Sequence, residues 1–428
     1  MKKVVKKIAL LLIVFGIGVG VTLLYTNNKY KVYDEEEPKQ IKKHVDTISM
    51  MLETEAGSGN YEMTTRSEWP TDGYIFNTTL SKCENGGELS WDDTNKRVLM
   101  SGNVSDKCYV YFDVYVPPTV VSDVCNGGET LSTCITTLSQ NSTSSYTNIY
   151  HHDSALANGA GDNSYRYAGA NPNNFVCFGT NTTPCPTDNL YRIIGVFGNQ
   201  VKLIKYDYAT SALLGTDGDY KGTGTPNASY YKGSLTTINT YYWNKATSKN
   251  TWSESNLNKV NLNTNFINNI RSEWAAKIAE TTWKVGGNTF ANIGTQPAKT
   301  AYQNEIVSPV TTNTTDGATE YSAKIGLMYV SDYMYAASQD KWTLVGNGSA
   351  TTDYRAATSV NWMYMGFGDW TISRIADNSS SVFGMYSTGY VDYGYVGGNS
   401  GCRPSFSLLS STTYVSGSGS ASDPMVIN

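Results

Sequence analysis

The chain has 428 residues, of which 40% are hydrophobic and 12% aromatic, so it can form packed cores and is not disordered throughout. Charged residues make up only 16%, whereas tyrosine (32) and glycine (39) are abundant, a balance typical of extracellular β-rich proteins. The net charge is −5 although nine lysines lie within residues 1–43, so the rest is acidic and we expect no nucleic-acid partner.

The N-terminal segment has the pattern of a membrane anchor. Four lysines precede an uncharged apolar run over residues 8–25, whose length is near the short end of what spans a bilayer. No small-residue cleavage site follows, which favours a retained anchor over a cleaved signal peptide. The sequence predicts a single-pass protein of the cell membrane, with residues 1–30 as cytoplasmic tail and transmembrane helix, and with the C-terminal region extracellular.

Two short segments follow the predicted anchor. Residues 31–60 are predicted to form a stalk helix and linker, because apolar residues recur at helical spacing from Ile41 to Leu52 before Gly57 and Gly59. Residues 61–118 alternate β-branched or aromatic runs with Asn-Gly-Gly and Asp-rich turns, which indicates a small all-β module.

The remaining chain divides at about residue 160. Residues 119–160 are rich in Ser, Thr and Asn without a sustained apolar period, and we interpret them as a linker. Residues 161–428 contain a predicted hairpin about the Phe-Gly-Asn turn at Phe197, then a helical stretch from Leu257 to Ile278, then many short strands. That order predicts an α+β domain.

The cysteines fall in local pairs that suit disulfides in an oxidising compartment. A zinc site is the competing interpretation, but no pair has the two-residue spacing of a zinc knuckle. Cys402 is left over, either as a buried apolar thiol or as a thiolate activated by its arginine neighbour. The predicted disulfide cysteines are Cys83 with Cys108, Cys125 with Cys134, and Cys177 with Cys185.

Several stretches resemble a known group of proteins: "WSESNLNKVNLNTNF", "AKIGLMYVSDY", "DWTISR" and "GCRPSFSL". They are similar to membrane-anchored surface proteins of gut Firmicutes and related Bacilli, whose C-terminal domain of unknown function resembles the C-type-lectin-like superfamily. That group includes the formylglycine-generating enzymes. The resemblance implies a C-terminal C-type-lectin-like domain, with Trp370, Gly389, Gly401, Arg403 and Pro404 in the places of the family's closing strands. Those enzymes use a pair of C-terminal cysteines, whereas this domain has Cys402 alone after Cys185.

The segment "GYVDYGYVGGNSGCRPSFSL" is the main candidate for a binding site. Tyrosines with small polar residues and glycines are the residue types that build antibody-like binding surfaces. The competing interpretation is a tyrosine-rich sheet face without a ligand. The predicted ligand-binding residues are Tyr386, Tyr390, Asp392, Tyr393, Tyr395, Asn399 and Arg403, the last also as a residue that holds the loop.

Other chemistries have weaker patterns. A histidine-dependent nucleophile would need an imidazole in the C-terminal domain, and the last histidine is His152. The "HHD" run at His151 places adjacent side chains on opposite faces of an extended chain, so we predict no metal site there. The loop from Asp217 to Gly222 lacks the closing Glu of an EF-hand, which indicates a turn. Four acidic residues remain candidates for paired carboxylates in a glycoside hydrolase, namely Asp332, Asp353, Asp369 and Asp377.

These patterns predict a membrane-anchored, adhesin-like protein that recognises an extracellular glycan or protein through Tyr/Gly-rich loops. No cofactor or metal is predicted, and the sequence does not specify an oligomeric state. The alternatives are a cell-wall-acting hydrolase and a structural component of a surface assembly. A deep pocket with perturbed carboxylates would favour the hydrolase, and a shallow aromatic patch would favour binding.

Overall fold

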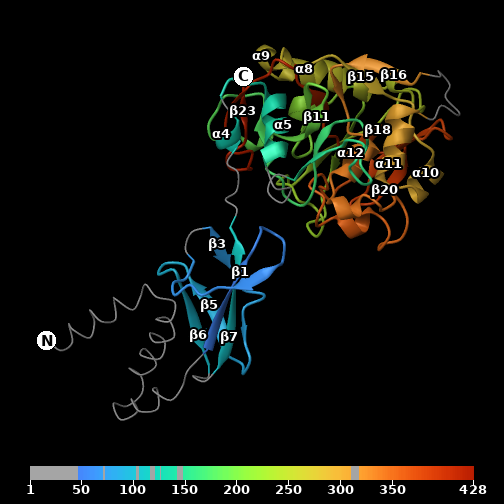
Figure 1. Cartoon of the computed structure of the whole chain (residues 1–428). Helices are drawn as coiled ribbons and strands as arrows, with labels where there is room; N and C mark the ends of the chain where they lie inside the picture. The colour runs from blue at the N-terminus through green and yellow to red at the C-terminus, as the bar shows by residue number, and fades with distance from the viewer. Residues whose placement is uncertain are drawn as a thin grey trace, which may run out of the picture. The chain divides into compact units, whose positions relative to one another are not determined.

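The chain divides into two units, residues 1–118 and residues 119–428. The structure, a computed structural model, describes residues 47–70, 73–102, 106–115, 121–125, 127–141, 148–309 and 318–428 (Figure 1). The predicted membrane anchor over residues 8–25 lies outside these ranges. Within them, no helix combines the length and hydropathy that a membrane span requires. The structure therefore gives no support to the predicted transmembrane helix or to the predicted single-pass membrane localisation.

The smaller unit is built from strands. Five of them form one sheet in the order β2-β1-β7-β3, with β4 also paired to β7, and β5 and β6 form a separate hairpin. The strands are β1 (Thr47–Glu53), β2 (Tyr61–Met63), β3 (Tyr74–Phe76), β4 (Lys82–Cys83), β5 (Glu88–Asp92), β6 (Arg97–Ser101) and β7 (Lys107–Val114).

The predicted stalk helix is wrong where the structure describes it, because β1 occupies its C-terminal part. β1 runs parallel to β7, with Met50 opposite Val110. Met50 is buried, and Ile48 and Leu52 pack against the same core. Apolar residues at 48, 50 and 52 fit the two-residue period of a strand as well as those at 41, 45, 48 and 52 fit a helix, and pairing with β7 decides between the two.

The main sheet of the larger unit has seven strands, in the order β17-β21-β12-β11-β9-β8, with β10 beside β11. The predicted hairpin about Phe197 is confirmed as β11 and β12, which pair antiparallel around Gly198, a residue at a positive φ of 62°. The strands are β8 (Ile149–His151), β9 (Tyr165–Tyr167), β10 (Phe175–Cys177), β11 (Leu190–Phe197), β12 (Gln200–Lys205), β17 (Ile325–Gly326) and β21 (Ser405–Ser407).

Smaller sheets surround the main one. A three-stranded antiparallel sheet consists of β18 (Asp369–Arg374), β19 (Ser381–Met385) and β20 (Val391–Tyr395). In Figure 1 it lies at the opposite end of this unit from β23 and the C-terminus. The two-stranded sheets are β13 (Tyr220–Gly224) with β14 (Ile238–Tyr241), β15 (Thr281–Lys284) with β16 (Glu320–Ala323), and β22 (Tyr414–Ser416) with β23 (Val426–Ile427).

Helices in the larger unit are short and lie between loops. The α-helices are α4 (Val121–Val124), α5 (Leu131–Asn141), α7 (Ser211–Leu214), α8 (Ile267–Asn269), α9 (Ser272–Ala275), α10 (Phe290–Thr295), α11 (Ala298–Tyr302) and α12 (Val330–Tyr335). Two π-helical segments are η3 (Leu257–Phe266) and η4 (Gln303–Val307). The 3-10 turns are η1 (Thr187–Asn189), η2 (Trp252–Glu254), η5 (Gln339–Lys341) and η6 (Tyr354–Ala357).

The predicted α+β class, with its C-type-lectin-like domain, is wrong, because the described residues are mostly in strands and loops, with 20% helix and 31% strand. Buried asparagines are one physical reason for the loops. Asn258 donates to the carbonyl of Trp252 at 3.0 Å, and Asn261 donates to that of Leu214 at 2.8 Å. Such side-chain bonds satisfy backbone groups that would otherwise need a helix or sheet partner.

Residues 121–141, part of the predicted linker over 119–160, belong to the core of the larger unit. Leu131, Cys134, Ile135 and Leu138 of α5 are buried in its hydrophobic cluster. In addition, Tyr414 donates its backbone N–H to Glu129, so the C-terminal residues lie beside the start of this unit (Figure 1). The linker interpretation is therefore wrong for this segment, and the larger unit begins well before residue 161.

The three predicted disulfides are confirmed. Cys83–Cys108 links β4 to β7 in the smaller unit, and Cys125–Cys134 joins α5 to the segment before it. Cys177–Cys185 closes the loop after β10. Each bridge ties down a short strand or a loop, which compensates for elements too short to be stable alone.

Candidate ligand-binding cleft

The tyrosine-rich segment forms β20, the second strand of the β19–β20 hairpin, and the residues after it as far as β21. Two tyrosine hydroxyls hold the turn between β19 and β20. Tyr333 donates a hydrogen bond to the Gly389 carbonyl and Tyr364 donates one to the Ser387 carbonyl, both at 2.6 Å. Gly389 has a φ of +102°, a conformation that side-chain-bearing residues rarely adopt. The turn is therefore held in one conformation by the core beneath it.

The hairpin presents tyrosines to solvent. Tyr386, Tyr393 and Tyr395 are 42%, 47% and 50% exposed. Tyr386 stacks on the half-buried Tyr390 with ring centroids 5.0 Å apart, and the Arg355 guanidinium lies 4.7 Å from the Tyr390 ring. These contacts fix ring orientations before any ligand arrives, which lowers the entropy cost of binding.

A cleft of about 490 Å³ opens beside this hairpin, and we call it the tyrosine cleft. Its volume falls within the roughly 300–1,000 Å³ typical of small-molecule sites. The lining combines aromatic or apolar surfaces with amides, hydroxyls and glycines. The lining residues are Thr225, Asn227, Phe367, Gly368, Trp370, Gly384, Met385, Tyr386, Ser387, Gly394, Tyr395, Gly398, Asn399 and Ser400.

Two of the glycines that line the cleft pack directly against Trp370. Gly384 and Gly394 lie next to Trp370, and a Cβ at Gly394 would lie 2.9 Å from the indole ring. Trp370 is buried and donates its Nε1–H to the Tyr241 carbonyl at 2.8 Å. Glycine at position 394 is needed because a larger residue there would displace this tryptophan.

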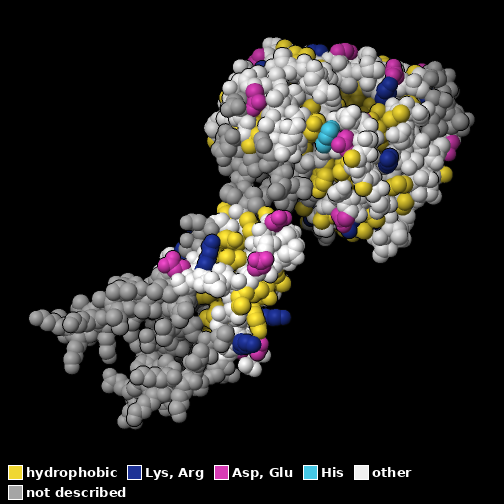
Figure 2. All heavy atoms as spheres, viewed as in Figure 1, with side chains coloured by type: hydrophobic (Ala, Val, Ile, Leu, Met, Phe, Trp, Pro, Cys, Tyr) yellow, Lys and Arg dark blue, Asp and Glu magenta, His cyan; other side chains and the backbone are white. Residues whose placement is uncertain are grey.

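None of the described residues that line the tyrosine cleft carries a charge. Burial, with a contribution from Asp392, raises the pKa of Tyr386, so its hydroxyl stays protonated at neutral pH and can donate a hydrogen bond. Figure 2 shows charged side chains scattered singly over the visible face of the larger unit, without a large patch of either sign. The cleft therefore offers ring faces and neutral hydrogen-bonding groups to a ligand.

The structure brings three of the predicted binding residues into the cleft: Tyr386, Tyr395 and Asn399. Tyr390, Asp392 and Tyr393 belong to the same hairpin without lining it, although Tyr393 is exposed and its ring packs edge-on against Phe290. Asp392 accepts a hydrogen bond from the Tyr393 backbone N–H at 2.8 Å, a local role within the hairpin.

Arg403, predicted to contact the ligand, does not line the tyrosine cleft: it is buried, and its guanidinium is engaged inside the fold. Its Nε donates to Asp369 Oδ2 at 2.6 Å, and its Nη2 donates to the Met363 carbonyl at 2.8 Å. Burial raises the pKa of Asp369, against the opposing effect of Arg403. The pair fastens β18 to the segment that carries Asn399 and Ser400, so Arg403 holds one wall of the tyrosine cleft.

Sequence reasoning missed the opposite wall. Thr225 and Asn227 come from the loop after β13, and Phe367 and Gly368 precede β18. The only local signal is the Gly-Phe-Gly run at 366–368, which indicates a turn without indicating what it faces. The two loops are far apart in the chain, and their meeting depends on the tertiary fold.

The acidic residues considered for hydrolysis do not form a pair. Asp332 bonds to Lys202, Asp353 to Arg355 and Asp369 to Arg403, and all three carboxylates are buried. Asp377 is exposed. Three of the four are thus engaged by different cations and none lines the tyrosine cleft.

The two described histidines, His151 and His152, have structural roles. His152 is fully buried, and its Nδ1 accepts the Ala160 backbone N–H at 3.0 Å. Burial, together with Arg166, lowers the pKa of His152 to about 2, so it is neutral at physiological pH. His151 stacks on Tyr165 with ring centroids 4.3 Å apart and lies 3.6 Å from Asp153.

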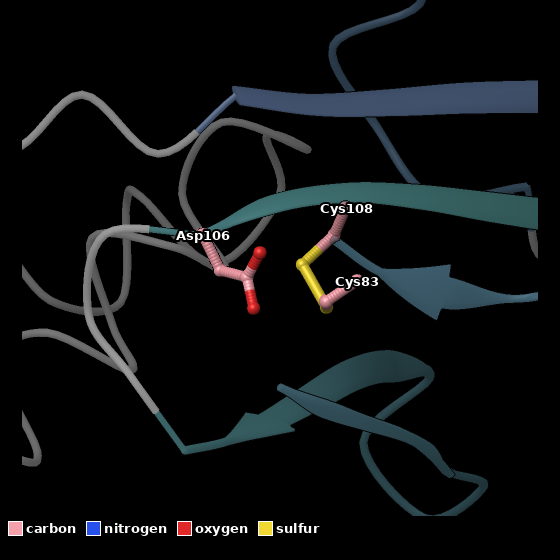
Figure 3. Close-up of side chains that lie close together, drawn as sticks. All are labelled: Cys83, Asp106 and Cys108. Atoms are coloured by element: carbon pink, nitrogen blue, oxygen red, sulfur yellow. A yellow bond between two sulfur atoms is a disulfide. The ribbon is translucent and has the colours of Figure 1, made fainter. Parts of the chain in front are cut away.

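Two groups of side chains have the composition of metal sites. Figure 3 shows Cys83 and Cys108 joined through their sulfurs, with the Asp106 carboxylate directed toward them. Disulfide sulfurs are not thiolates and are poor ligands. Asp106 accepts backbone N–H groups from Asn85 at 2.8 Å and Gly87 at 2.9 Å, which gives it a structural role. Cys125 and Cys134, grouped with Glu129, are likewise disulfide-bonded.

Asp219, in the loop that lacks the closing Glu of an EF-hand, is also structural. It is 1% exposed and accepts the backbone N–H groups of Lys245 at 3.1 Å and Leu257 at 3.0 Å. The free thiol of Cys402 is buried as well.

Comparison with known proteins gives no match to a protein-family profile, to a curated protein or to a solved structure. The resemblance to the C-type-lectin-like superfamily therefore gains no support from these comparisons.

Proposed function

We propose that the larger unit is a binding module that takes a neutral carbohydrate in the tyrosine cleft. The observation that carries the proposal is the lining itself: the rings of Tyr386 and Tyr395 stand beside Ser387, Asn399 and Ser400, and the described lining residues are all neutral. Sugars present apolar C–H faces that pack on aromatic rings, and their hydroxyls pair with neutral amides and alcohols.

Rigidity of the cleft also favours binding over catalysis. Tyr333 and Tyr364 hold the turn, and the Arg403–Asp369 pair holds the segment opposite it. Among the described residues, no carboxylate, histidine or thiol lines the cleft, so these residues supply no general acid, general base or charged nucleophile. A preformed neutral cleft of this kind suits binding of a ligand without chemical conversion of that ligand.

The test compares two tyrosines on one strand. The purified protein is screened on a glycan array, and any ligand found is titrated against Tyr395→Ala and against Tyr393→Ala as the matched control. Both residues are about half exposed on β20, but only Tyr395 lines the cleft. We expect Tyr395→Ala to weaken binding at least tenfold, equivalent to about 1.4 kcal/mol, and Tyr393→Ala to leave it nearly unchanged.

Two results would count against the proposal. Folded protein that binds no glycan on the array removes the carbohydrate assignment. Equal losses from the two substitutions would place the ligand across the outer face of the hairpin, as expected for a protein partner, and not in the tyrosine cleft.

A further inference from the structure

A second cavity of about 220 Å³ lies elsewhere in the larger unit, where β9, β12, β15 and α12 meet. We call it the Arg166 pocket. Unlike the tyrosine cleft, it is lined by charged side chains. Asp162 and Lys284 are partly exposed, and the three others are buried: Arg166 of β9, Lys202 of β12 and Asp332 of α12. Their exposures are only 2%, 7% and 3%, so these charges are removed from water at the cost of desolvation.

The carboxylates at this pocket are well supplied with donors. Asp332 Oδ2 accepts from Lys202 Nζ at 2.5 Å and from the Tyr329 backbone N–H at 2.9 Å. Asp162 Oδ1 accepts from the backbone and hydroxyl of Ser164, and its Oδ2 accepts from Arg166 Nη2 at 2.6 Å. Internal donors therefore satisfy most of the negative charge.

The cations, in contrast, retain donors. Arg166 uses Nε and Nη2, whereas its Nη1 is 3.9 Å from Asp332 Oδ1, beyond hydrogen-bond distance. Lys202 Nζ bonds to one oxygen and otherwise faces aromatic rings, at 4.5 Å from the centroid of Tyr329 and 5.4 Å from that of Trp283. Among the described residues, Arg166 Nη1 makes no hydrogen bond and Lys202 Nζ makes one. Buried donors of charged groups are costly to leave unpaired, so an acceptor from outside fits here.

Aromatic side chains form the rest of the walls. The Arg166 guanidinium lies 4.7 Å from the ring centroid of Phe197 and 5.1 Å from that of Tyr302, which holds its plane in a fixed orientation. Trp283 lines the same cavity. A ligand that reaches the free donors therefore has its remaining atoms against apolar surface.

Charge and size restrict the ligand further. Two buried cations face two carboxylates, Asp162 and Asp332, and the third lining cation, Lys284, is paired with Glu320. Little net positive charge is therefore left for a dianion such as phosphate. A planar carboxylate matches the geometry of a guanidinium edge. The volume is below the roughly 300–1,000 Å³ of sites for drug-sized ligands, which indicates a smaller molecule.

We propose that the Arg166 pocket binds a small organic carboxylate, whose oxygens accept hydrogen bonds from Arg166 Nη1 and Lys202 Nζ and whose apolar part packs between Phe197, Trp283 and Tyr302. This site is separate from the tyrosine cleft, and its occupation does not depend on a carbohydrate ligand.

The experiment is a calorimetric titration of the purified protein with benzoate, with benzyl alcohol and inorganic phosphate as comparison probes. We expect saturable binding of benzoate and none of benzyl alcohol, which has the ring without the charge. Lys202→Met should weaken benzoate binding at least tenfold, because it removes a charged donor. Lys205→Met is the matched control: Lys205 is another buried lysine of β12, it donates to the Asp188 carbonyl, and it does not line the pocket.

A second pair of variants covers the case in which Lys202→Met does not fold. Thr282 lines the mouth of the pocket and is exposed. Thr282→Glu should weaken benzoate binding at least threefold by adding a negative charge, whereas Thr282→Gln should not. The proposal is overturned if benzoate does not bind, if phosphate binds as tightly as benzoate, or if Thr282→Glu and Thr282→Gln bind benzoate equally.

Discussion

Glu305 gives the sharpest test of the interior of the larger unit. It lies in η4, is 1% exposed, and accepts the Ser331 backbone N–H at 3.0 Å. Burial, with a smaller contribution from Asp332, raises its pKa from 4.5 to about 7. The folded state therefore retains a proton over a pH range in which the unfolded chain has lost it.

The sign and size of the effect follow from proton linkage. Between pH 4.5 and pH 7 the folded state binds more protons, so the free energy of unfolding falls as pH rises, by about 1.4 kcal/mol per pH unit. The stability contributed by the protonated carboxyl is fully present below pH 4.5 and is lost as pH rises through 7. Over pH 4 to 8 the loss is on the order of 3 kcal/mol.

The assay is urea unfolding of wild type and Glu305→Gln, followed by tryptophan fluorescence at pH values from 4 to 8. Glutamine cannot titrate, so we expect the variant to gain about 3 kcal/mol relative to wild type across this range. Glu280→Gln, at an exposed glutamate of the same unit, controls for the chemical change. A wild-type–variant difference that varies by less than about 0.5 kcal/mol over the whole range, the size of an ordinary surface effect, would refute the reasoning.

Two further predictions concern buried groups near the tyrosine cleft. Arg403→Met should lower the free energy of unfolding by about 3–5 kcal/mol, because the substitution leaves Asp369 buried without its cation. Thermal unfolding of the variant and of wild type measures the difference. A loss below about 1 kcal/mol would contradict the prediction. Cys402 is fully buried and burial raises its pKa well above the ordinary value. A thiol reagent should therefore not react with the native protein and should label Cys402 once the chain is unfolded with its disulfides intact; rapid labelling of native protein would disprove the burial.

The disulfides and the β11–β12 hairpin were predictable because their signals are local. Cys125 and Cys134 are nine residues apart, and Cys177 and Cys185 are eight apart, so loop closure brings each pair together at little entropy cost. The turn at Gly198 needs only the two strands that flank it. In each case the interaction is contained within a short stretch of chain.

The errors arose where a distant partner decides the local structure. β1 is a strand because β7, much later in the chain, supplies its hydrogen-bond partners. α5 resembles a polar linker in its Ser and Thr content, yet one face of it is buried against the main cluster of the larger unit. A narrow apolar face is enough for packing, and composition alone does not reveal it.

The tyrosine cleft was half predictable for the same reason. Tyr386, Tyr395 and Asn399 lie in one Tyr/Gly-rich segment, whereas the wall at Thr225 and Phe367 comes from loops that only the fold brings near. The residue types of this segment were enough to predict its part of the lining, since exposed tyrosines and glycine turns are common at binding surfaces.

Charge was the least reliable guide in this chain, because several of its charged side chains are in the interior. The pairs Arg403–Asp369 and Lys202–Asp332 are buried, and each joins segments that are distant in the sequence. Removal of one partner from such a pair leaves an uncompensated buried charge, so each pair opposes separation of the segments that it joins. The burial of Arg403 explains why the tyrosine cleft is neutral although a cation lies close to its lining. The larger unit thus has two kinds of lining: aromatic rings and amides in the tyrosine cleft, and cationic hydrogen-bond donors in the Arg166 pocket. Ligand selectivity should divide accordingly, with a neutral sugar in the tyrosine cleft and a carboxylate in the Arg166 pocket.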